Sequence, residues 1–259
     1  MKSVVGTAGW SLPANQKPMF PSEGTHLQRY AQVFNGVEIN SSFYRDHQAT
    51  TYAKWAASTP DDFLFSVKLS RHFTIDTRLR ETERIEGVLG AISALGKKWG
   101  VLLVQLPPSL TFEAGTAAKF FGEVREHYRG ALALEPRHPS WVSSPALKLI
   151  ESYDITKVEA DPESCPGGAN PRSSWRYVRW HGSPEIYKSR YSEVQIQQLA
   201  NDLRLMEKPA WIIFDNTTFG YALENASELK ALLQDTSLSR VSAPKKNPAL
   251  GRAFKTPFF

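Results

Sequence analysis

Disulfide bonds and membrane spans have little support in this sequence. The 259 residues include one cysteine, Cys165, which has no partner within the chain, as is usual in a reducing compartment. No apolar run approaches the roughly 18 residues that a membrane helix needs, and residues 1–5 lead directly into a strand-like run rather than the apolar core of a signal peptide. We therefore expect a soluble, cytoplasmic protein with no membrane partner.

Three short motifs of familiar enzyme classes are also missing. The sequence contains no GxxxxGK[ST] phosphate loop, no GxGxxG after a strand and no GxSxG elbow. Nucleotide-driven phosphoryl transfer, Rossmann-type cofactors and hydrolases with a serine elbow are therefore not expected. The formal net charge of +5 favours anionic partners in general, but an excess of this size gives only weak support for nucleic acid.

The chain does contain a repeated alternation of apolar runs with helical patterns. The runs are short, rich in Val, Ile, Leu and Phe, and often follow Gly or Pro, which is typical of buried parallel strands. Eight runs alternating with helices predict an α/β fold, a TIM-barrel-like (β/α)8 barrel, whose usual length is about 250 residues. The predicted strands are 3–6, 36–40, 63–68, 100–105, 131–135, 156–161, 176–181 and 210–215. The predicted helices are 25–34, 51–58, 82–98, 114–128, 146–153, 192–206 and 221–234.

Two segments depart from this pattern. Residues 161–174 hold three prolines and two glycines, which predicts an irregular connection after strand six in place of a helix. Residues 237–259 carry prolines among scattered basic side chains, with no helical or strand period. We therefore expect one barrel domain over residues 1–236 and a basic, Pro-containing C-terminal tail over residues 237–259.

Charged or amide side chains stand where nearly every predicted strand stops. Parallel strands end at one rim, and barrels bind their ligands there. Strand alternation places Glu38 on the same face as Asn40, and Glu135 on the same face as Arg137, so both pairs would point into the barrel mouth. A satisfied buried ion pair is the structural alternative for each of them. The residues at the strand ends are Glu38, Asn40, Lys68, Gln105, Glu135, Arg137, His138, Asp161, Arg179, His181 and Asn216.

Eight segments resemble the DUF72 family, which includes YecE-like bacterial proteins. They are GTAGW at 6–10, FNGVEINSSFYR at 34–45, KWAASTP at 54–60, FLFSVK at 63–68, LLVQLPPS at 102–109, LEPRHPSW at 134–141, YVRWHG at 177–182 and FDNTTFGYALENA at 214–226. Their order and spacing are compatible with the family. The resemblance implies a TIM-barrel-like fold and no established activity, because the family is named for a domain of unknown function. The resemblance also implies site positions at Tyr44 and Asn225. This chain differs from the family at Asp215, where Asn is usual.

The two glutamates suit general acid and base catalysis. Glu38 and Glu135 would face each other across the mouth. Glu135 beside Arg137 should stay ionised, whereas Glu38 against Phe43 and Tyr44 would favour its protonated form. Histidines at strand ends are alternative proton carriers. The predicted catalytic residues are Glu38, Glu135, His138 and His181.

Cationic side chains at the rim predict an anionic ligand. Lys68, Arg137 and Arg179 can bind carboxylate or phosphate oxygens through charge-assisted hydrogen bonds. Tyr44 and Trp141 follow strand ends and would offer a stacking platform. We expect a small sugar-phosphate-like or nucleotide-derived substrate for a hydrolase, lyase or isomerase. The predicted substrate-binding residues are Asn40, Tyr44, Lys68, Gln105, Arg137, Trp141, Arg179, Asn216 and Asn225.

Two other functions stay open. Glu135, Asp161 and His181, with Asp215, supply oxygen and nitrogen ligands that would suit a divalent-metal-dependent hydrolase or isomerase. Against a metal, there is no HxH or HExxH spacing, and Arg137 would repel a cation. The third hypothesis is a non-catalytic protein that binds nucleic acid or another anion, for which salt-dependent binding would be the sign.

Overall fold

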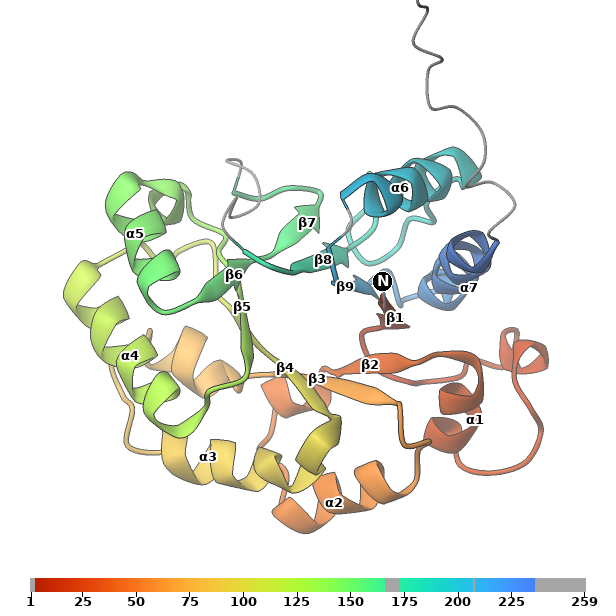
Figure 1. Cartoon of the computed structure of the whole chain (residues 1–259), viewed down its shortest axis with the longest axis horizontal. Coiled ribbons are helices and arrows are strands. Elements are labelled where there is room, and N and C mark those ends of the chain that lie inside the picture. The colour runs from red at the N-terminus through yellow and green to blue at the C-terminus, as the bar shows by residue number, and fades with distance from the viewer. Residues whose placement is uncertain (1–2, 166–172, 207, 236–259) are drawn as a thin grey trace, which may run out of the picture.

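The computed structural model shows parallel strands in a ring with helices around it (Figure 1). It describes residues 3–165, 173–206 and 208–235. The strands form two parallel sheets, in the orders β1-β9-β8-β7 and β2-β3-β4-β5-β6. They are β1 Val4–Thr7, β2 Gly36–Ile39, β3 Leu64–Lys68, β4 Trp99–Gln105, β5 Ala131–Glu135, β6 Ile155–Lys157, β7 Glu159–Asp161, β8 Arg176–Trp180 and β9 Ala210–Phe214.

Two junctions link the sheets. Beyond β1, Ala8 forms a parallel bridge with Glu38 of β2, and the Gly9 amide donates to the Glu38 carbonyl at 2.8 Å. On the other side, β6 and β7 are separated by Val158 alone, whose amide donates to the Leu134 carbonyl of β5 at 2.8 Å. The single strand predicted at 156–161 is therefore divided between the two sheets. The predicted class, a parallel α/β fold of the TIM-barrel kind, is confirmed.

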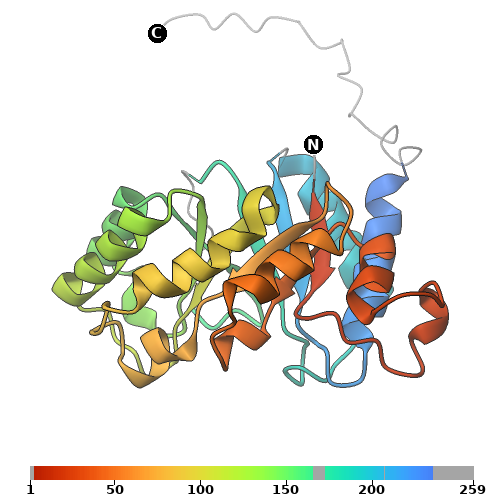
Figure 2. The same cartoon turned by 90° about the horizontal axis from the view of Figure 1, so that it is seen from below.

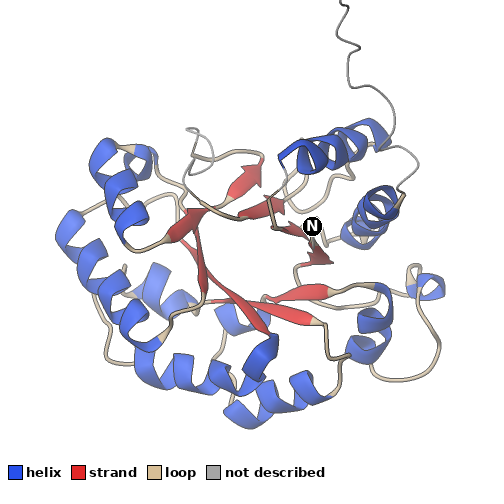
Figure 3. Cartoon of the chain, in the orientation of Figure 1, coloured by secondary structure: helices blue, strands red, loops and turns tan. Residues whose placement is uncertain are grey.

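The helices lie outside the ring (Figure 3), and seen from below several of them lie in front of the strands (Figure 2). They are α1 His26–Val33, α2 Ala49–Ala57, α3 Ile85–Ile92, α4 Ala114–His127, α5 Ser144–Ser152, α6 Glu193–Met206 and α7 Tyr221–Gln234. Local sequence sets their ends: the Thr25 hydroxyl accepts the Gln28 amide at 3.3 Å and the Gln28 side chain accepts the Thr25 amide at 2.9 Å, a capping box that begins α1. The helix predicted at 82–98 ends at Ile92 and continues as 3₁₀ turns, in which Gly96 has a φ of 57°.

The connection after β7 and the end of the chain differ from the other repeats. The described residues between Asp161 and Arg176 form no helix, as the sequence predicts for an irregular connection. The tail predicted over residues 237–259 lies outside the described residues, so the domain boundaries stay a prediction. Within the described part of the chain, no helix is long and apolar enough to cross a membrane.

Side chains that point into the ring are apolar at its centre. Val101 and Leu103 of β4 pack there with Tyr177 and Trp211, whereas Leu102 belongs to the core shared with the helices. Strand alternation explains this division. A close backbone approach accommodates the Trp211 ring, because a Cβ atom on Gly100 would lie 2.3 Å from that ring. This apolar layer forms the floor beneath the carboxyl ends of the strands.

Candidate functional site

The inward side chains become polar toward the carboxyl ends of the strands. In β4, Val101 and Leu103 are followed by Gln105 at the same alternation. In β8, Tyr177 is followed by Arg179. The apolar floor thus passes into a polar layer near the rim, where barrels of this kind bind their ligands.

Arg179 is the centre of a closed ion-pair network. Its Nε and Nη2 donate to the two oxygens of Glu38 at 3.0 and 2.8 Å. Its Nη1 donates to Glu135 at 2.5 Å, and Nη2 also donates to Asp215 at 2.9 Å. Every nitrogen of this fully buried guanidinium is therefore bound to a carboxylate. Carboxylates of the protein contact all three nitrogens, and binding of a substrate anion by Arg179 stays a prediction.

Burial and pairing act against each other in this network. Burial lowers the pKa of Arg179, but Glu38, Glu135 and Asp215 outweigh it and hold that pKa well above its usual range. Burial raises the pKa of Glu135, but Arg179 and His181 outweigh it and hold that pKa well below its usual range. Arg179 and Glu135 are therefore charged near neutral pH, and each depends on its partners, because an unpaired buried charge is costly.

Glu38 lies in a polar environment. Besides Arg179, its Oε2 accepts the Tyr177 hydroxyl at 2.9 Å, and that hydroxyl lies 2.7 Å from Ser66 Oγ. The Tyr44 side chain, expected to cover the carboxyl, is 69% exposed. The apolar surroundings assumed for a proton-donating Glu38 are therefore absent from the described contacts of this residue.

His181 lies between two carboxylates. Its Nδ1 is 3.0 Å from Asp215 Oδ2, and its Nε2 is 3.2 Å from Glu135 Oε1. Burial lowers the pKa of His181, but Glu135 and the hydrogen bond of Asp215 outweigh it, so that pKa is raised. The imidazolium form satisfies both contacts, because both ring nitrogens then donate. His181 is therefore arranged as a proton donor.

Arg137 is the more accessible cation of the mouth. Its Nε and Nη2 donate to Glu135 Oε1 at 3.0 and 2.9 Å, and Gln105 Nε2 donates to the same oxygen at 2.9 Å. The Arg137 side chain keeps 22% of its surface exposed. Burial lowers the pKa of Arg137, but Glu135 outweighs it and the pKa is raised. Arg137 therefore stays charged where a ligand would enter.

Lys68, the last residue of β3, is buried, and its amine has no polar partner among the described residues. The residue is 5% exposed, and its Nζ forms no hydrogen bond or ion pair with any described residue. The amine lies over the Phe43 ring, 4.1 Å from the centroid. Burial, followed by the charge of Arg179, lowers the pKa of Lys68 to about 8, against the opposing effect of Glu38. Lys68 can therefore gain or lose a proton near neutral pH.

The turn after β2 fixes the ring beneath this amine. Ser42 Oγ lies 2.8 Å from the Ile39 carbonyl and 2.6 Å from the Lys68 carbonyl, which ties the turn to the end of β3. Phe43 follows directly. Asn40 lies at the start of the same turn, and its buried Oδ1 has no hydrogen-bond partner. An unsatisfied buried acceptor costs about 1–3 kcal/mol. A ligand hydroxyl or amine would satisfy it.

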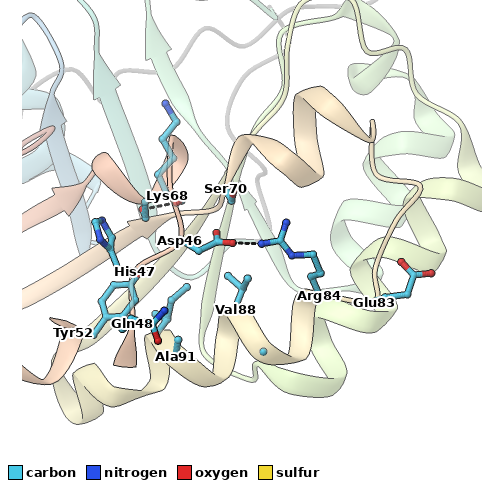
Figure 4. A pocket seen from close by; sticks show the side chains of 13 residues that line it. Asp46, His47, Gln48, Tyr52, Lys68, Ser70, Glu83, Arg84, Val88 and Ala91 are labelled. Carbon is cyan, nitrogen blue, oxygen red and sulfur yellow. Dashed lines mark hydrogen bonds and ion pairs between the residues drawn. The ribbon is translucent and has the colours of Figure 1, made fainter. Parts of the chain in front are cut away.

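A cavity of about 400 Å³ lies beside the mouth, between α2 and α3. The ion pair of Asp46 with Arg84 lies at this cavity, and the apolar side chains of Val88 and Ala91 line it. Lys68 also lines it, but Figure 4 shows its side chain extending away from the other labelled residues. The amine of Lys68 therefore belongs to the barrel mouth rather than to this cavity.

Three predicted substrate-binding residues have structural partners. Trp141 is 1% exposed, packs against Phe112 and donates its Nε1–H to the Leu110 carbonyl at 2.9 Å. The short 3₁₀ helix after β5 turns this ring into the core. Asn216 and Asn225 are fully buried, and Asn216 Nδ2 donates to Asn225 Oδ1 at 3.1 Å. Asn216 Nδ2 also donates to the Ser189 carbonyl at 2.9 Å, so α7 and the turn after β9 are tied to the loop after β8. The binding roles of all three residues stay predictions.

Two other predicted residues also have local partners. His138 Nδ1 accepts the Ser140 amide at 3.2 Å and so caps the short helix that follows β5. Asp161 Oδ1 accepts the Tyr191 hydroxyl at 2.8 Å. Neither side chain has a hydrogen bond to the Arg179 network in the described part of the chain. His138 as a proton carrier stays a prediction.

The proposed metal ligands are not gathered in one group. Among the described residues, the group of three potential ligands whose atoms lie within 4.8 Å of one another is Glu123, Glu126 and His127 on α4, which shares no residue with the predicted set of Glu135, Asp161 and His181. Between the carboxylates of the mouth lies the Arg179 guanidinium. The metal set stays a prediction.

Two residues of the mouth were not predicted from the sequence, and a third, Asp215, was named only beside the possible metal ligands. Strand β9 ends at Phe214, so alternation does not give the direction of Asp215. Tyr177 precedes Arg179 by two residues, a spacing that could have revealed it. Tyr187 stands in the loop after β8 with a φ of 68°, and its ring lies edge-on to His181, with centroids 5.9 Å apart. No sequence signal marks Tyr187.

Known proteins resemble this chain in sequence or in structure. The UPF0759 protein YunF of Bacillus subtilis is 23% identical over 88% of this chain and 94% of its own length. A DUF72 family protein of Thermotoga maritima has a TM-score of 0.73 at 24% identity, over 90% of this chain and 100% of its own. One from Enterococcus faecalis has a TM-score of 0.74 at 19% identity, over 90% of this chain and 95% of its own.

Solved structures of proteins with other names share only the fold. An L-ribulose 3-epimerase has a TM-score of 0.56 at 13% identity, over 95% of this chain and 100% of its own. The SacUVDE structure has a TM-score of 0.57 at 8% identity, over 93% of this chain and 100% of its own. The family model described as "Protein of unknown function DUF72" matches residues 4–249, and this chain therefore belongs to the DUF72 family.

Proposed function

We propose that this DUF72 protein is an enzyme that moves protons on a small anionic substrate at the carboxyl-terminal mouth of the barrel. The observation that carries the proposal is the unpartnered amine of Lys68 beside the saturated Arg179 network. A structural ion pair would have given this lysine a carboxylate, because an unpaired buried charge is costly. Ionisable groups whose pKa is shifted by burial and by a nearby charge are concentrated at active sites.

The charge balance of the mouth supports an anionic substrate. Glu38, Glu135 and Asp215 contribute three negative charges, which Arg179, Arg137 and Lys68 offset when all are ionised. Protonated His181 adds one positive charge that no further carboxylate of this group balances. A phosphate or carboxylate group at Arg137 would complete the balance through charge-assisted hydrogen bonds.

Each group has a role that follows from its surroundings. Lys68 has a pKa of about 8, close to the working pH that general acid–base catalysis favours, and acts as the base when neutral. His181, held between two carboxylates, is the proton donor. Arg137 binds the anionic end of the substrate. Glu38 and Arg179 position these groups.

The substrate class that we propose is sugar-phosphate-like or nucleotide-derived. Structures named D-psicose 3-epimerase and L-ribulose 3-epimerase are among the proteins that share the fold, at TM-scores of 0.53 and 0.56. A shared fold at this distance makes a sugar-like substrate a reasonable first choice for screening and supports nothing finer.

Proton abstraction can be tested without knowing the product. The wild-type protein is incubated in D₂O with a panel of sugar phosphates and nucleotides, and NMR follows deuterium exchange at carbon positions, with and without EDTA or added divalent metal. We expect metal-independent exchange with at least one phosphorylated sugar. Lys68→Met should abolish it, whereas the exposed control Lys97→Met should keep it.

Other outcomes would favour the other hypotheses. Exchange that appears only with added metal would support a metal-dependent isomerase or hydrolase. A ligand that raises the thermal stability of the protein and shows no exchange would support a non-catalytic anion-binding protein. Exchange that is equal in the wild type and in Lys68→Met would contradict the proposed role of Lys68.

A further inference from the structure

The amine of Lys68 has the surroundings of a nucleophile as well as those of a base. Nucleophilic lysines are desolvated and lie near another cation, so that the neutral amine is available. Lys68 is buried at the end of β3, has no polar partner among the described residues and lies near the fixed charge of Arg179. We infer that Lys68 forms a covalent imine with a small hydroxy-aldehyde or hydroxy-ketone, an inference that rests on the proposed function of the same mouth.

The covalent step needs no reactant beyond the substrate. The neutral amine attacks the carbonyl carbon, and the C–N bond forms as the carbonyl π bond breaks. Proton transfer from nitrogen to oxygen gives a carbinolamine. Its hydroxyl leaves as water after protonation, for which His181 is the donor, and the nitrogen lone pair forms the C=N bond. Loss of water leaves the imine already protonated, and this cation acidifies the adjacent C–H bond. Because the Lys68 nitrogen is then part of the imine, the C–H proton passes to His181, which is neutral after protonating the leaving hydroxyl.

The orientation of the amine is fixed by its neighbours. Ser42 ties the turn after β2 to the Lys68 carbonyl, and the Phe43 ring lies against the amine. An aromatic face attracts the ammonium form but offers no proton acceptor, so it does not hold the amine in a salt bridge. The lone pair of the neutral amine is therefore free for a carbonyl carbon.

The buried side-chain oxygen of Asn40 is the reason why we expect a hydroxyl group on the substrate. Ile39 at the end of β2 pairs with Val67 of β3, so Asn40 and Lys68 directly follow two paired residues. Asn40 Oδ1 is buried and has no donor among the described residues. A hydroxyl next to the carbonyl group would donate to this oxygen, while the anionic end reaches Arg137. A hydroxy-carbonyl compound with a phosphate or carboxylate group fits these three positions.

Borohydride trapping tests the imine directly. The full chain is incubated at pH 8 with dihydroxyacetone phosphate, glyceraldehyde 3-phosphate or pyruvate, and sodium borohydride then reduces any imine to a stable secondary amine. Peptide mass spectrometry locates the adduct. We expect labelling of Lys68 at least tenfold above that of the exposed Lys97, no adduct at position 68 in Lys68→Met, and unchanged labelling of position 68 in Lys97→Met. Far-ultraviolet circular dichroism checks that each variant is folded.

A second variant tests the hydroxyl. Asn40→Leu should reduce labelling by dihydroxyacetone phosphate roughly tenfold, the effect of losing about 1.4 kcal/mol, and leave labelling by pyruvate unchanged, because pyruvate has no hydroxyl. Equal loss with both compounds would overturn the role of Asn40. Absence of a Lys68 adduct with all three compounds would overturn the imine. If deuterium exchange still depends on Lys68 in that case, the proposed acid–base function stands without it.

Discussion

Arg179 and Lys68 are both buried cations of the barrel mouth, and they differ in what surrounds them. Arg179 is bound to three carboxylates, whereas Lys68 has none within the described residues. Both lie in the same electrostatic field, since Arg179 itself lowers the pKa of Lys68. A buried charge that is paired stabilises the structure around it, and we propose that the unpaired amine of Lys68 is the reactive group.

Removal of Arg179 should have the largest effect on stability. Arg179→Met leaves Glu38, Glu135 and Asp215 buried without their shared cation, and we expect a loss of about 3–5 kcal/mol in the free energy of unfolding. Urea unfolding measures it. Arg71→Met removes the exposed pair with Asp76 and serves as the control, with an expected loss below about 1 kcal/mol. A small loss in Arg179→Met would mean that the network contributes little to the fold.

Removal of Lys68 should increase the free energy of unfolding, whereas removal of Arg179 decreases it. Its folded pKa of about 8 lies below its usual 10.5, so between these values the unfolded chain binds more protons and stability rises with pH. Below pH 8 the buried charge costs on the order of 3 kcal/mol. Lys68→Met should therefore be more stable than wild type below pH 8, and this advantage should fade toward pH 10.5. A destabilised variant throughout this range would argue for a structural lysine.

Neutralising Glu38 should have a smaller cost than removing Arg179. Glu38→Gln keeps a side chain of the same shape, and Arg179 retains Glu135 and Asp215. We expect a loss of about 2 kcal/mol in the free energy of unfolding, measured by the same urea titration. An unchanged stability would contradict the network seen here.

The mildest change is Asp215→Asn, which replaces the acid with the amide usual in the family. Asp215 helps to raise the pKa of His181 through its hydrogen bond, so that pKa should fall in the variant. The stability that protonation of His181 contributes is present below the pKa that this histidine has in the unfolded chain, and it is lost as the pH rises through the pKa in the folded protein. In the variant, this loss of stability should therefore occur at lower pH. An NMR titration of the histidine ring resonances measures it, with exposed His26 as the internal reference. A His181 pKa that is higher in Asp215→Asn than in the wild type would contradict this role of Asp215.

Alternation along single strands made much of the barrel and its rim predictable. Glu38 and Glu135 were expected to face the mouth, and both lie there. The pairing between strands was not predictable, because Arg179 meets Glu38 across 141 positions of sequence. Sequence patterns give the direction of a side chain within its own strand. They do not give the partner that a closed ring brings against it.

Prediction failed where the strands had already ended. Asp215 and Asn216 follow β9, and Trp141 lies in the 3₁₀ turn after β5, so strand alternation says nothing of their directions. Lys68 was found by its place at a strand end, but its lack of a partner is a property of the whole mouth. That property distinguishes it from Arg179, which the sequence had assigned the same role.

The protonation of Lys68 is the most direct measure of the difference between these two cations. NMR with selectively ¹³C-labelled lysine follows each Cε resonance with pH, and Lys68→Met identifies the signal. We predict a midpoint of about 8 for Lys68, whereas exposed lysines titrate near about 10.4. A Lys68 signal that titrates together with the exposed lysines would contradict a poised amine in the mouth of this barrel.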